Sequence, residues 1–204
     1  MFNVFLSHAV EQSDFVREVA LAMEEQNLAP FMASRDIPKG AEWLPNLEDA
    51  LQSAEALAAF LTPDFRQSDW CDQEIGYALG RQRPVVPLQL ADGLRPYGYL
   101  ARYQLVETIG LTPPEVAKAI FDTLYVRTRE QRKLTASVLH GLLNERRVEF
   151  IRLWANRLAV AQGQLTSEDL KAAQRALRQN TVLRTDRIAL SLMTDILPDD
   201  IQEA

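Results

Sequence analysis

Short apolar runs alternate with longer amphipathic stretches along the first 125 residues of the chain. The apolar runs lie at 3–7, 29–32, 55–61, 85–90 and 103–108, and stretches with helical spacing lie at 14–26, 43–53, 69–81 and 115–125. Strands that alternate with helices pair in parallel, because each helix is the crossover that joins two parallel neighbours. The pattern therefore predicts an open, doubly wound α/β domain in which helices flank a five-stranded parallel sheet.

The last helix of this domain has a start signal of its own, the sequence TPPE at 112–115. Thr112 can cap the helix, and Glu115 completes a capping box. The two prolines suit the first turn, because an N–H there would have no partner within the helix. We therefore expect the helix to begin directly after Thr112.

Strand signals stop after Tyr125, and apolar residues then recur at helical spacing, as in Phe150, Trp154 and Leu158. The charge changes at the same point of the chain. Residues 1–126 hold 9 basic and 18 acidic side chains, a net charge of −9, whereas residues 127–204 hold 13 and 10, a net charge of +3. We therefore predict one domain at 1–126 and an all-helical C-terminal module at 127–204.

The composition narrows the class of protein. With 204 residues, 47% of them hydrophobic, the chain can bury a sizeable core. Its single cysteine, Cys71, excludes an internal disulfide framework and a zinc site built from several thiols, so no metal is predicted. The net charge of −6 argues against nucleic acid as a main partner. Because the residues after Met1 lack the pattern of a signal peptide, and no apolar run approaches the roughly 20 residues of a membrane helix, we expect a cytoplasmic protein without membrane contact.

Candidate chemistry lies in the loops that follow the strands, since ligands of open α/β sheets bind outside the carboxyl ends of the strands. The loop TPDFRQSDW after the third run leads into a helix that carries Trp70 and Glu74. At about 100° per residue, Cys71 and Ile75 fall on the stripe that packs on the sheet, while Trp70 and Glu74 lie on a flank beside it. Glu74 is thus predicted at the edge of the core, facing a cleft. The alternative is an ordinary solvated glutamate beside a partly buried tryptophan anchor.

Three motifs favour a functional role for Trp70 and Glu74, because they occur in the order and with the spacing of a single protein family. NVFLSHAVEQSDFVREVALAM, SRDIPKGAEWLPNLEDAL and SDWCDQEIGYALG followed by RPVVPLQL together resemble a Toll/interleukin-1 receptor (TIR) domain of the bacterial kind over residues 2–125. The resemblance implies a flavodoxin-like sheet. It also implies that WCDQE supplies the tryptophan, Trp70, and the catalytic glutamate, Glu74, of TIR domains that cleave NAD⁺.

By the same resemblance, the loop at 34–43 gates the active site and makes assembly contacts. The sequence departs from the family at Ala33, where an acidic residue is frequent, and at Lys39, where many relatives have a second proline. These departures leave the details of loop closure and assembly open. Within the loop, Gly40 is expected to have a positive φ, and Trp43 is expected to pack the loop against the next helix.

A single carboxylate is enough for the chemistry that the resemblance implies. Hydrolysis of an ordinary glycoside needs two carboxyl groups, one of them to protonate a poor leaving group. Nicotinamide leaves NAD⁺ as a neutral molecule, so no general acid is required. What remains is to hold the ribose and stabilise a cationic transition state, which the Glu74 carboxylate can do electrostatically. Trp70, one turn earlier, would supply an aromatic wall for a ring of the substrate.

Other candidates for substrate contact are Ser7, His8, Arg35 and Ser68. Ser7 and His8 end the first strand at the correct edge of the sheet, but neighbours on a strand point to opposite faces, so they do not form a nucleophilic pair. A satisfied loop histidine is the alternative for His8. Arg35 either reaches a phosphate or forms an ion pair with Asp36 that shapes the loop. Ser68 or Asp69 is expected to cap the helix that carries Glu74, and the free N–H groups at that helix start can bind a pyrophosphate.

These interpretations lead to an NAD⁺ glycohydrolase or cyclase that releases nicotinamide with ADP-ribose or a cyclic ADP-ribose isomer, in bacterial defence against phage. NAD⁺ would be a substrate and not a cofactor, because no G-x-G-x-x-G follows the first strand. Expected partners are further copies of the chain, through the 34–43 loop and the C-terminal helices, and a partner protein of a defence system. The rival is a TIR scaffold that binds other TIR domains without chemistry. A third possibility, an enzyme similar to nucleoside deoxyribosyltransferases, fits the 34–43 loop less well.

Overall fold

The computed structural model describes residues 1–128 and 131–197. It divides into two compact units, Met1–Arg129 and Glu130–Ala204. The helix α5 spans Pro113–Arg127, so the predicted end of the first domain at residue 126 falls within its last turn. The helix outlasts its apolar pattern because backbone hydrogen bonds continue past Tyr125, up to the 2.9 Å bond from the Thr128 N–H to the Leu124 carbonyl.

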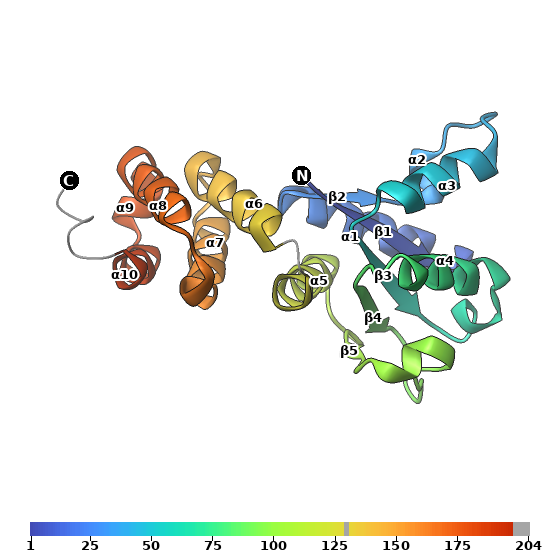
Figure 1. The fold of residues 1–204 in the computed structure, drawn as a ribbon. Coiled ribbons are helices and arrows are strands. Elements are labelled where there is room, and N and C mark those ends of the chain that lie inside the picture. Colours follow the sequence, from blue (N-terminus) through green and yellow to red (C-terminus); the bar gives the residue numbers. More distant parts are fainter. Residues whose placement is uncertain (129–130, 198–204) are drawn as a thin grey trace. The chain divides into compact units, whose positions relative to one another are not determined.

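The first unit is built on the predicted five-stranded sheet, in which all neighbouring strands are parallel. Its strands are β1 (Phe2–His8), β2 (Leu28–Phe31), β3 (Ala56–Leu61), β4 (Val85–Gln89) and β5 (Val106–Glu107). Their order is β2-β1-β3-β4-β5 (Figure 1). The α/β fold read from the alternation of apolar runs is confirmed. Only β5 is much shorter than its apolar run, with two residues in place of six.

Helices cover both faces of this sheet, as the term doubly wound requires. They are α1 (Ser13–Glu25), α2 (Ala33–Asp36), α3 (Trp43–Ser53), α4 (Asp69–Gly80) and α5, with 3₁₀ turns η1 (Val10–Gln12), η2 (Phe65–Gln67) and η3 (Gly98–Arg102). The helix α1 packs against α5 on one face. On the other face, α3 and α4 bury Leu47, Leu51 and Ile75 against Phe5 and Leu57 of the sheet. This apolar core includes Cys71 and Ile75 of α4, the helix that carries Glu74.

The capping box predicted at Thr112 is present. The Glu115 carboxylate accepts hydrogen bonds from the Thr112 N–H at 2.8 Å and from the Thr112 hydroxyl at 2.7 Å. The helix α5 begins at Pro113, as the sequence indicates.

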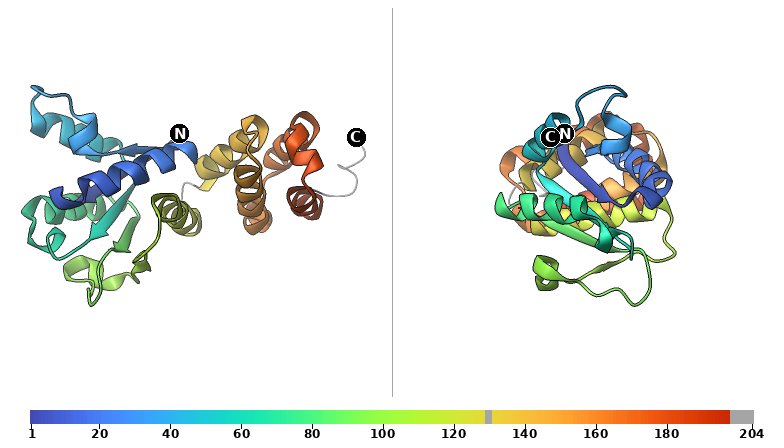
Figure 2. Two further views of the ribbon diagram at one scale, coloured as in Figure 1. Left: turned by 180° about the vertical axis from the view of Figure 1, so that it is seen from behind. Right: turned by 90° about the vertical axis from the view of Figure 1, so that its right-hand side faces the viewer.

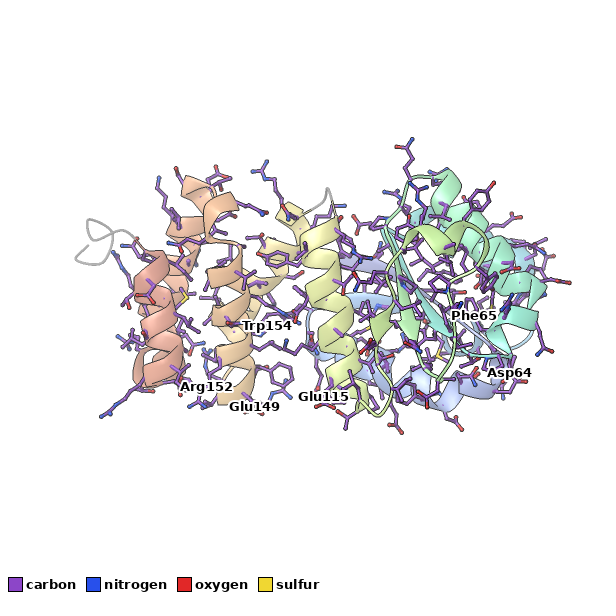
Figure 3. The ribbon with its side chains drawn as sticks, turned by 90° about the horizontal axis from the view of Figure 1, so that it is seen from below. Asp64, Phe65, Glu115, Glu149, Arg152 and Trp154 are labelled. Carbon is purple, nitrogen blue, oxygen red and sulfur yellow. The ribbon has the colours of Figure 1, made fainter. Side chains whose placement is uncertain are left out.

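The described residues of the second unit form helices joined by short connections, which confirms the predicted C-terminal helices. Its elements are α6 (Gln131–Asn144), α7 (Val148–Val160), η4 (Gln162–Gln164), α8 (Ser167–Gln179), α9 (Thr181–Thr185) and α10 (Arg187–Ile196). Trp154, in the middle of α7, is fully buried among the helices (Figure 3). The helix α6 can approach it closely because Gly141 has no side chain. A Cβ at residue 141 would lie 2.5 Å from the indole nitrogen of Trp154.

Candidate functional site

A cavity of about 430 Å³ opens at the carboxyl end of β1, within the range of roughly 300–1,000 Å³ typical of small-molecule sites. Its walls come from the end of β1, the loop into α1, the short helix α2, the start of α3, and the turn that leads from β3 into α4. In the sheet order, β1 lies between β2 and β3. From β1 the chain first adds β2 on one side and then crosses over to add β3 on the other side, so the direction of strand addition reverses at β1. Ligands of doubly wound sheets bind at such a switch point. Figure 2 gives two further views of the first unit and its sheet.

Glu74 forms part of the cavity wall and is deeper than the sequence suggested. Its exposed fraction is 9%, so it is buried and not merely at the edge of the core. The Ser7 hydroxyl donates a hydrogen bond of 2.5 Å to Oε2 of its carboxyl group. Burial raises the pKa of Glu74 to about 7, against an opposing, smaller effect of the Ser7 hydrogen bond. At neutral pH the carboxyl group therefore exchanges readily between its protonated and ionised forms.

The start of α4 sets the position of Glu74. Ser68 is the N-cap, and its hydroxyl accepts a hydrogen bond of 3.4 Å from the Cys71 N–H. Cys71 and Ile75 then pack into the core, which turns Glu74 toward β1. Burial raises the pKa of the Cys71 thiol to about 11, so this cysteine is no thiolate nucleophile. Ser68 lies at the helix start, as predicted, and it also lines the cavity.

Two tryptophans line the same cavity, and only Trp70 is a candidate from the sequence. Trp70 precedes Glu74 by one turn and is 49% exposed. Trp43, the first residue of α3, is 46% exposed and also lines the cavity. The sequence predicts that Trp43 packs the loop against the next helix; in the structure nearly half of its surface is exposed and it lines the cavity. Gly40 has the predicted positive φ, of +86°, in the turn before it.

Ser7 and His8 have separate roles, in line with their opposite directions on β1. Ser7 is buried and contacts Glu74, so it does not itself line the cavity. His8 does line it. Its Nδ1 lies 3.0 Å from the Leu6 carbonyl, which places the proton on Nδ1, and its Nε2 lies 3.5 Å from the Ser13 hydroxyl. Burial lowers the pKa of His8, so the ring is neutral and Nε2 is an acceptor beside the cavity.

Arg35 lies outside the residues that line the cavity. Its guanidinium group contacts Glu24 at 2.9 Å and Asp36 at 2.7 Å, and it donates to the Pro30 carbonyl at 3.1 Å. Asp36 in turn accepts a hydrogen bond of 2.7 Å from the Met32 N–H. The geometry corresponds to the structural alternative, an ion pair that shapes the loop, and we assign Arg35 no contact with a ligand.

The charged side chains that line the cavity are all acidic. Besides Glu74 they are Glu11, in η1, and Asp64, in the turn before α4. Figure 3 labels Asp64 beside Phe65. No lysine or arginine is among the lining residues, which all belong to the described part of the chain. Glu11 and Asp64 were not among the site residues predicted from the sequence. Their positions in the loops after β1 and β3 were the signal that could have found them.

The described residues hold no group of three or more His, Cys, Asp or Glu side chains arranged to bind a metal ion. Within the same residues, none of the helices combines the length and the apolar character that crossing a membrane requires.

Comparison with known proteins identifies the family of the first unit. The sequence pattern of the TIR domain matches residues 4–125, which is more than half of the chain. The chain belongs to the TIR domain family. A similar solved structure is the TIR domain of the Toll-related receptor TRR-2 from Hydra magnipapillata, with a TM-score of 0.47 and 18% sequence identity over 66% of this chain and 98% of that chain. The search of curated proteins finds no match.

Proposed function

We propose that this TIR domain protein cleaves the bond between nicotinamide and ribose in NAD⁺, with Glu74 as the catalytic residue. The observation that carries the proposal is the Glu74 carboxyl group itself, which is buried in a cavity wall and held by Ser7. A solvated glutamate would have neither the burial nor the raised pKa. Desolvated carboxylates in ligand-sized cavities are typical of active sites.

The reaction breaks the C1′–N1 bond, and its electron pair goes to the pyridinium nitrogen, so nicotinamide leaves uncharged. Positive charge then develops on the ribose. The ionised Glu74 stabilises that charge, and its effect is large because little water reaches the carboxylate. Trp70 and Trp43 provide aromatic faces for the planar rings of the substrate.

The second product depends on what attacks C1′. Attack by water, which gives up its proton, yields ADP-ribose, whereas attack by the adenosine part of the same molecule yields a cyclic isomer. We propose a role in bacterial defence against phage, where loss of NAD⁺ or a nucleotide signal is the output. The protein would act in the cytoplasm, and a further protein of the same defence system would control it.

The test is incubation of the purified protein with NAD⁺, at low and high protein concentration, followed by chromatography of the products. Glu74→Gln should lower nicotinamide release by about two to three orders of magnitude, as expected when a main electrostatic group is lost. The matched control is Glu18→Gln on α1, an exposed carboxylate outside the cavity, which should leave the rate unchanged. Equal release by folded Glu74→Gln and wild-type protein would contradict the proposal.

A second candidate function is a TIR scaffold without chemistry. The observation in its favour is the exposed apolar surface at the start of α3, where Trp43 is 46% and Leu44 is 49% exposed. TIR domains commonly self-associate, and exposed apolar groups at a loop are suited to that. Two results together would favour the scaffold. The wild type would release no nicotinamide at any protein concentration, and its assembly would require Trp43 and Leu44.

We also propose that the protein forms homo-oligomers through the 34–43 loop and the C-terminal helices. In the second unit, Val160 and Ile188 are exposed, which leaves apolar surface for contact with another chain. Opposite net charges of the two parts of the chain, −9 for 1–126 and +3 for 127–204, favour contacts between the helices of one copy and the TIR domain of another.

A further inference from the structure

The charge distribution around the cavity has a consequence for the class of substrate. Glu11, Asp64 and Glu74 line the cavity, and the lining residues include no lysine or arginine. The imidazole of His8, which also lines the cavity, is neutral because burial lowers its pKa. A bound ligand therefore meets carboxylates and aromatic faces and no compensating cation.

Basic residues of the segments that form the cavity lie elsewhere. Arg35 is held by Glu24 and Asp36. Arg66 lies over the ring of Tyr97, with 5.1 Å between the guanidinium carbon and the ring centroid. Lys39, in the segment between α2 and α3, is not among the lining residues.

The start of α4 does not replace these cations. An uncompensated helix N-terminus attracts anions, but the first turn of α4 already carries Asp69 and Asp72. The Ser68 hydroxyl is engaged with the Cys71 N–H. The carboxylates of Asp69 and Asp72 would repel a pyrophosphate at this helix start, which argues against the expectation that one binds there.

We propose that the cavity selects substrates through the cationic half, the pyridinium ring and its ribose, and discriminates against each additional phosphate. Glu11 and Asp64 are the specificity-determining residues, because both stand at the cavity and both are exposed to approaching ligands. The inference rests on the proposed function and refines its substrate class to N-ribosylated pyridinium compounds of low negative charge. NADP⁺ should then be a poor substrate, and nicotinamide riboside should be accepted.

Two matched pairs of compounds isolate the effect of one phosphate. Nicotinamide riboside differs from nicotinamide mononucleotide by a phosphate on the same ribose, and NAD⁺ differs from NADP⁺ by a phosphate on the adenosine. The member of each pair with fewer phosphates should have the larger kcat/KM, by about fivefold to tenfold at low ionic strength. The ratio should fall toward one at about 1 M salt, where the screening length is only a few Å.

The double variant Glu11→Gln with Asp64→Asn should reduce both ratios at low salt. The matched control, Glu18→Gln with Glu107→Gln, removes the same charge from exposed positions outside the cavity and should leave the ratios near the wild-type values. Two results would overturn the inference: kcat/KM ratios near one at low salt, or ratios that both double variants change equally. Nicotinamide release from NAD⁺ in the same experiment would still support the proposed function.

A binding measurement separates the two ideas if no compound is cleaved. Trp43 and Trp70 line the cavity, so quenching of their fluorescence reports occupancy. Without nicotinamide release the proposed function fails. The charge inference then holds if nicotinamide riboside quenches at lower concentration than the mononucleotide, and it fails if the two titrations coincide.

Discussion

The Ser7 hydroxyl donates a hydrogen bond of 2.5 Å to Oε2 of Glu74, and it links the end of β1 to the second turn of α4 across 67 positions of the sequence. Both residues are buried, so the bond is screened little by solvent. It holds one oxygen of the carboxyl group in place beside the cavity. It also opposes the desolvation that raises the pKa of Glu74. The pair therefore governs both the orientation and the ionisation of the proposed catalytic group.

Removing the hydroxyl in Ser7→Ala should reduce NAD⁺ cleavage at pH 7. Without the donor, the ionised form of Glu74 loses stabilisation, so its pKa rises further and less carboxylate is present. We expect a loss of roughly threefold to tenfold at pH 7, recovered in part at higher pH. The measurement is a pH profile of kcat/KM, with Ser7→Thr as the variant that keeps a hydroxyl. An unchanged profile in Ser7→Ala would show that Ser7 does not control the ionisation of Glu74.

The pH profile of the wild type follows from the same carboxyl group. Because the ionised form is the active one, kcat/KM for NAD⁺ should rise with pH and level off above the pKa of Glu74, which is about 7. Steady-state rates between pH 5 and pH 9 provide the measurement. A profile that is flat across this range would contradict the assignment of Glu74 as the ionised group.

Stability should respond to Glu74 in the direction opposite to activity. Burial raises the pKa of Glu74 from 4.5 to about 7, so the folded state binds the proton more tightly than the unfolded state. The contribution of Glu74 to the free energy of unfolding is therefore fully present below its unfolded-state pKa. It is lost as the pH rises from that pKa to the folded-state pKa, by roughly 3 kcal/mol in total. Glu74→Gln, which cannot ionise, should be more stable than the wild type above pH 7 and show little difference near pH 4.

Urea unfolding of both proteins at pH 4.5, 6 and 8 measures this difference. The control is Glu18→Gln, an exposed carboxylate on α1, whose unfolding should follow the wild type at each pH. A Glu74→Gln protein that is less stable than the wild type at pH 8 would mean that the carboxylate makes a net favourable contribution to folding.

In the helical unit, Gly141→Ala should be destabilising. A methyl group at residue 141 would lie 2.5 Å from Nε1 and 2.6 Å from Cε2 of the buried Trp154 indole, so α6 and α7 must move apart. We expect a loss of about 1–3 kcal/mol, although alanine normally favours a helix over glycine. Gly163→Ala, in the same unit with no atom within 4 Å of the added methyl group, is the control. Thermal unfolding of the full chain checks both, and a stabilised Gly141→Ala protein would refute the close approach.

The proposed assembly predicts a concentration-dependent mass for the full chain. Light scattering should detect a dimer or larger species, because Val160 and Ile188 are exposed on the helical unit. A chain that ends at Thr128 should dissociate and lose nicotinamide release. Identical monomeric masses and equal activity of the two chains would rule out a role of the C-terminal helices in assembly.

Local signals in the sequence were sufficient for the strands and the longer helices and for part of the site, but not for the short helix α2, which lies in a stretch expected to be a loop. Apolar runs of strand length and helical spacings recover the order of strands and helices, and the capping box at Thr112 marks the start of α5 correctly. Trp70 and Glu74 could be placed on one flank of their helix, because the 3.6-residue period relates positions four apart regardless of the rest of the fold. The Cys71 side of that helix was correctly expected to face the core.

The remainder of the site depends on contacts between segments that are far apart in the chain. Trp43, Glu11 and Asp64 reach one cavity because parallel strands bring the loops at their carboxyl ends to the same edge of the sheet. Arg35 is drawn away from it by Glu24, which belongs to another helix and has no short-range signal linking it to the loop. The raised pKa of Glu74 likewise cannot be predicted from a local sequence pattern, because it results from the packing of α4 on β1.

By itself, the sequence determined the strands, the main helices and the sheet class, since these follow from periodicity and capping within a few residues. Its resemblance to TIR domains, and not periodicity, assigned the proposed chemistry to Trp70 and Glu74. Only the tertiary structure decided how deeply Glu74 is buried, that Ser7 is its partner, and that the cavity around it is acidic. Burial and electrostatic environment are sums over neighbours that strand order and helix packing bring together. No single stretch of the chain encodes such sums.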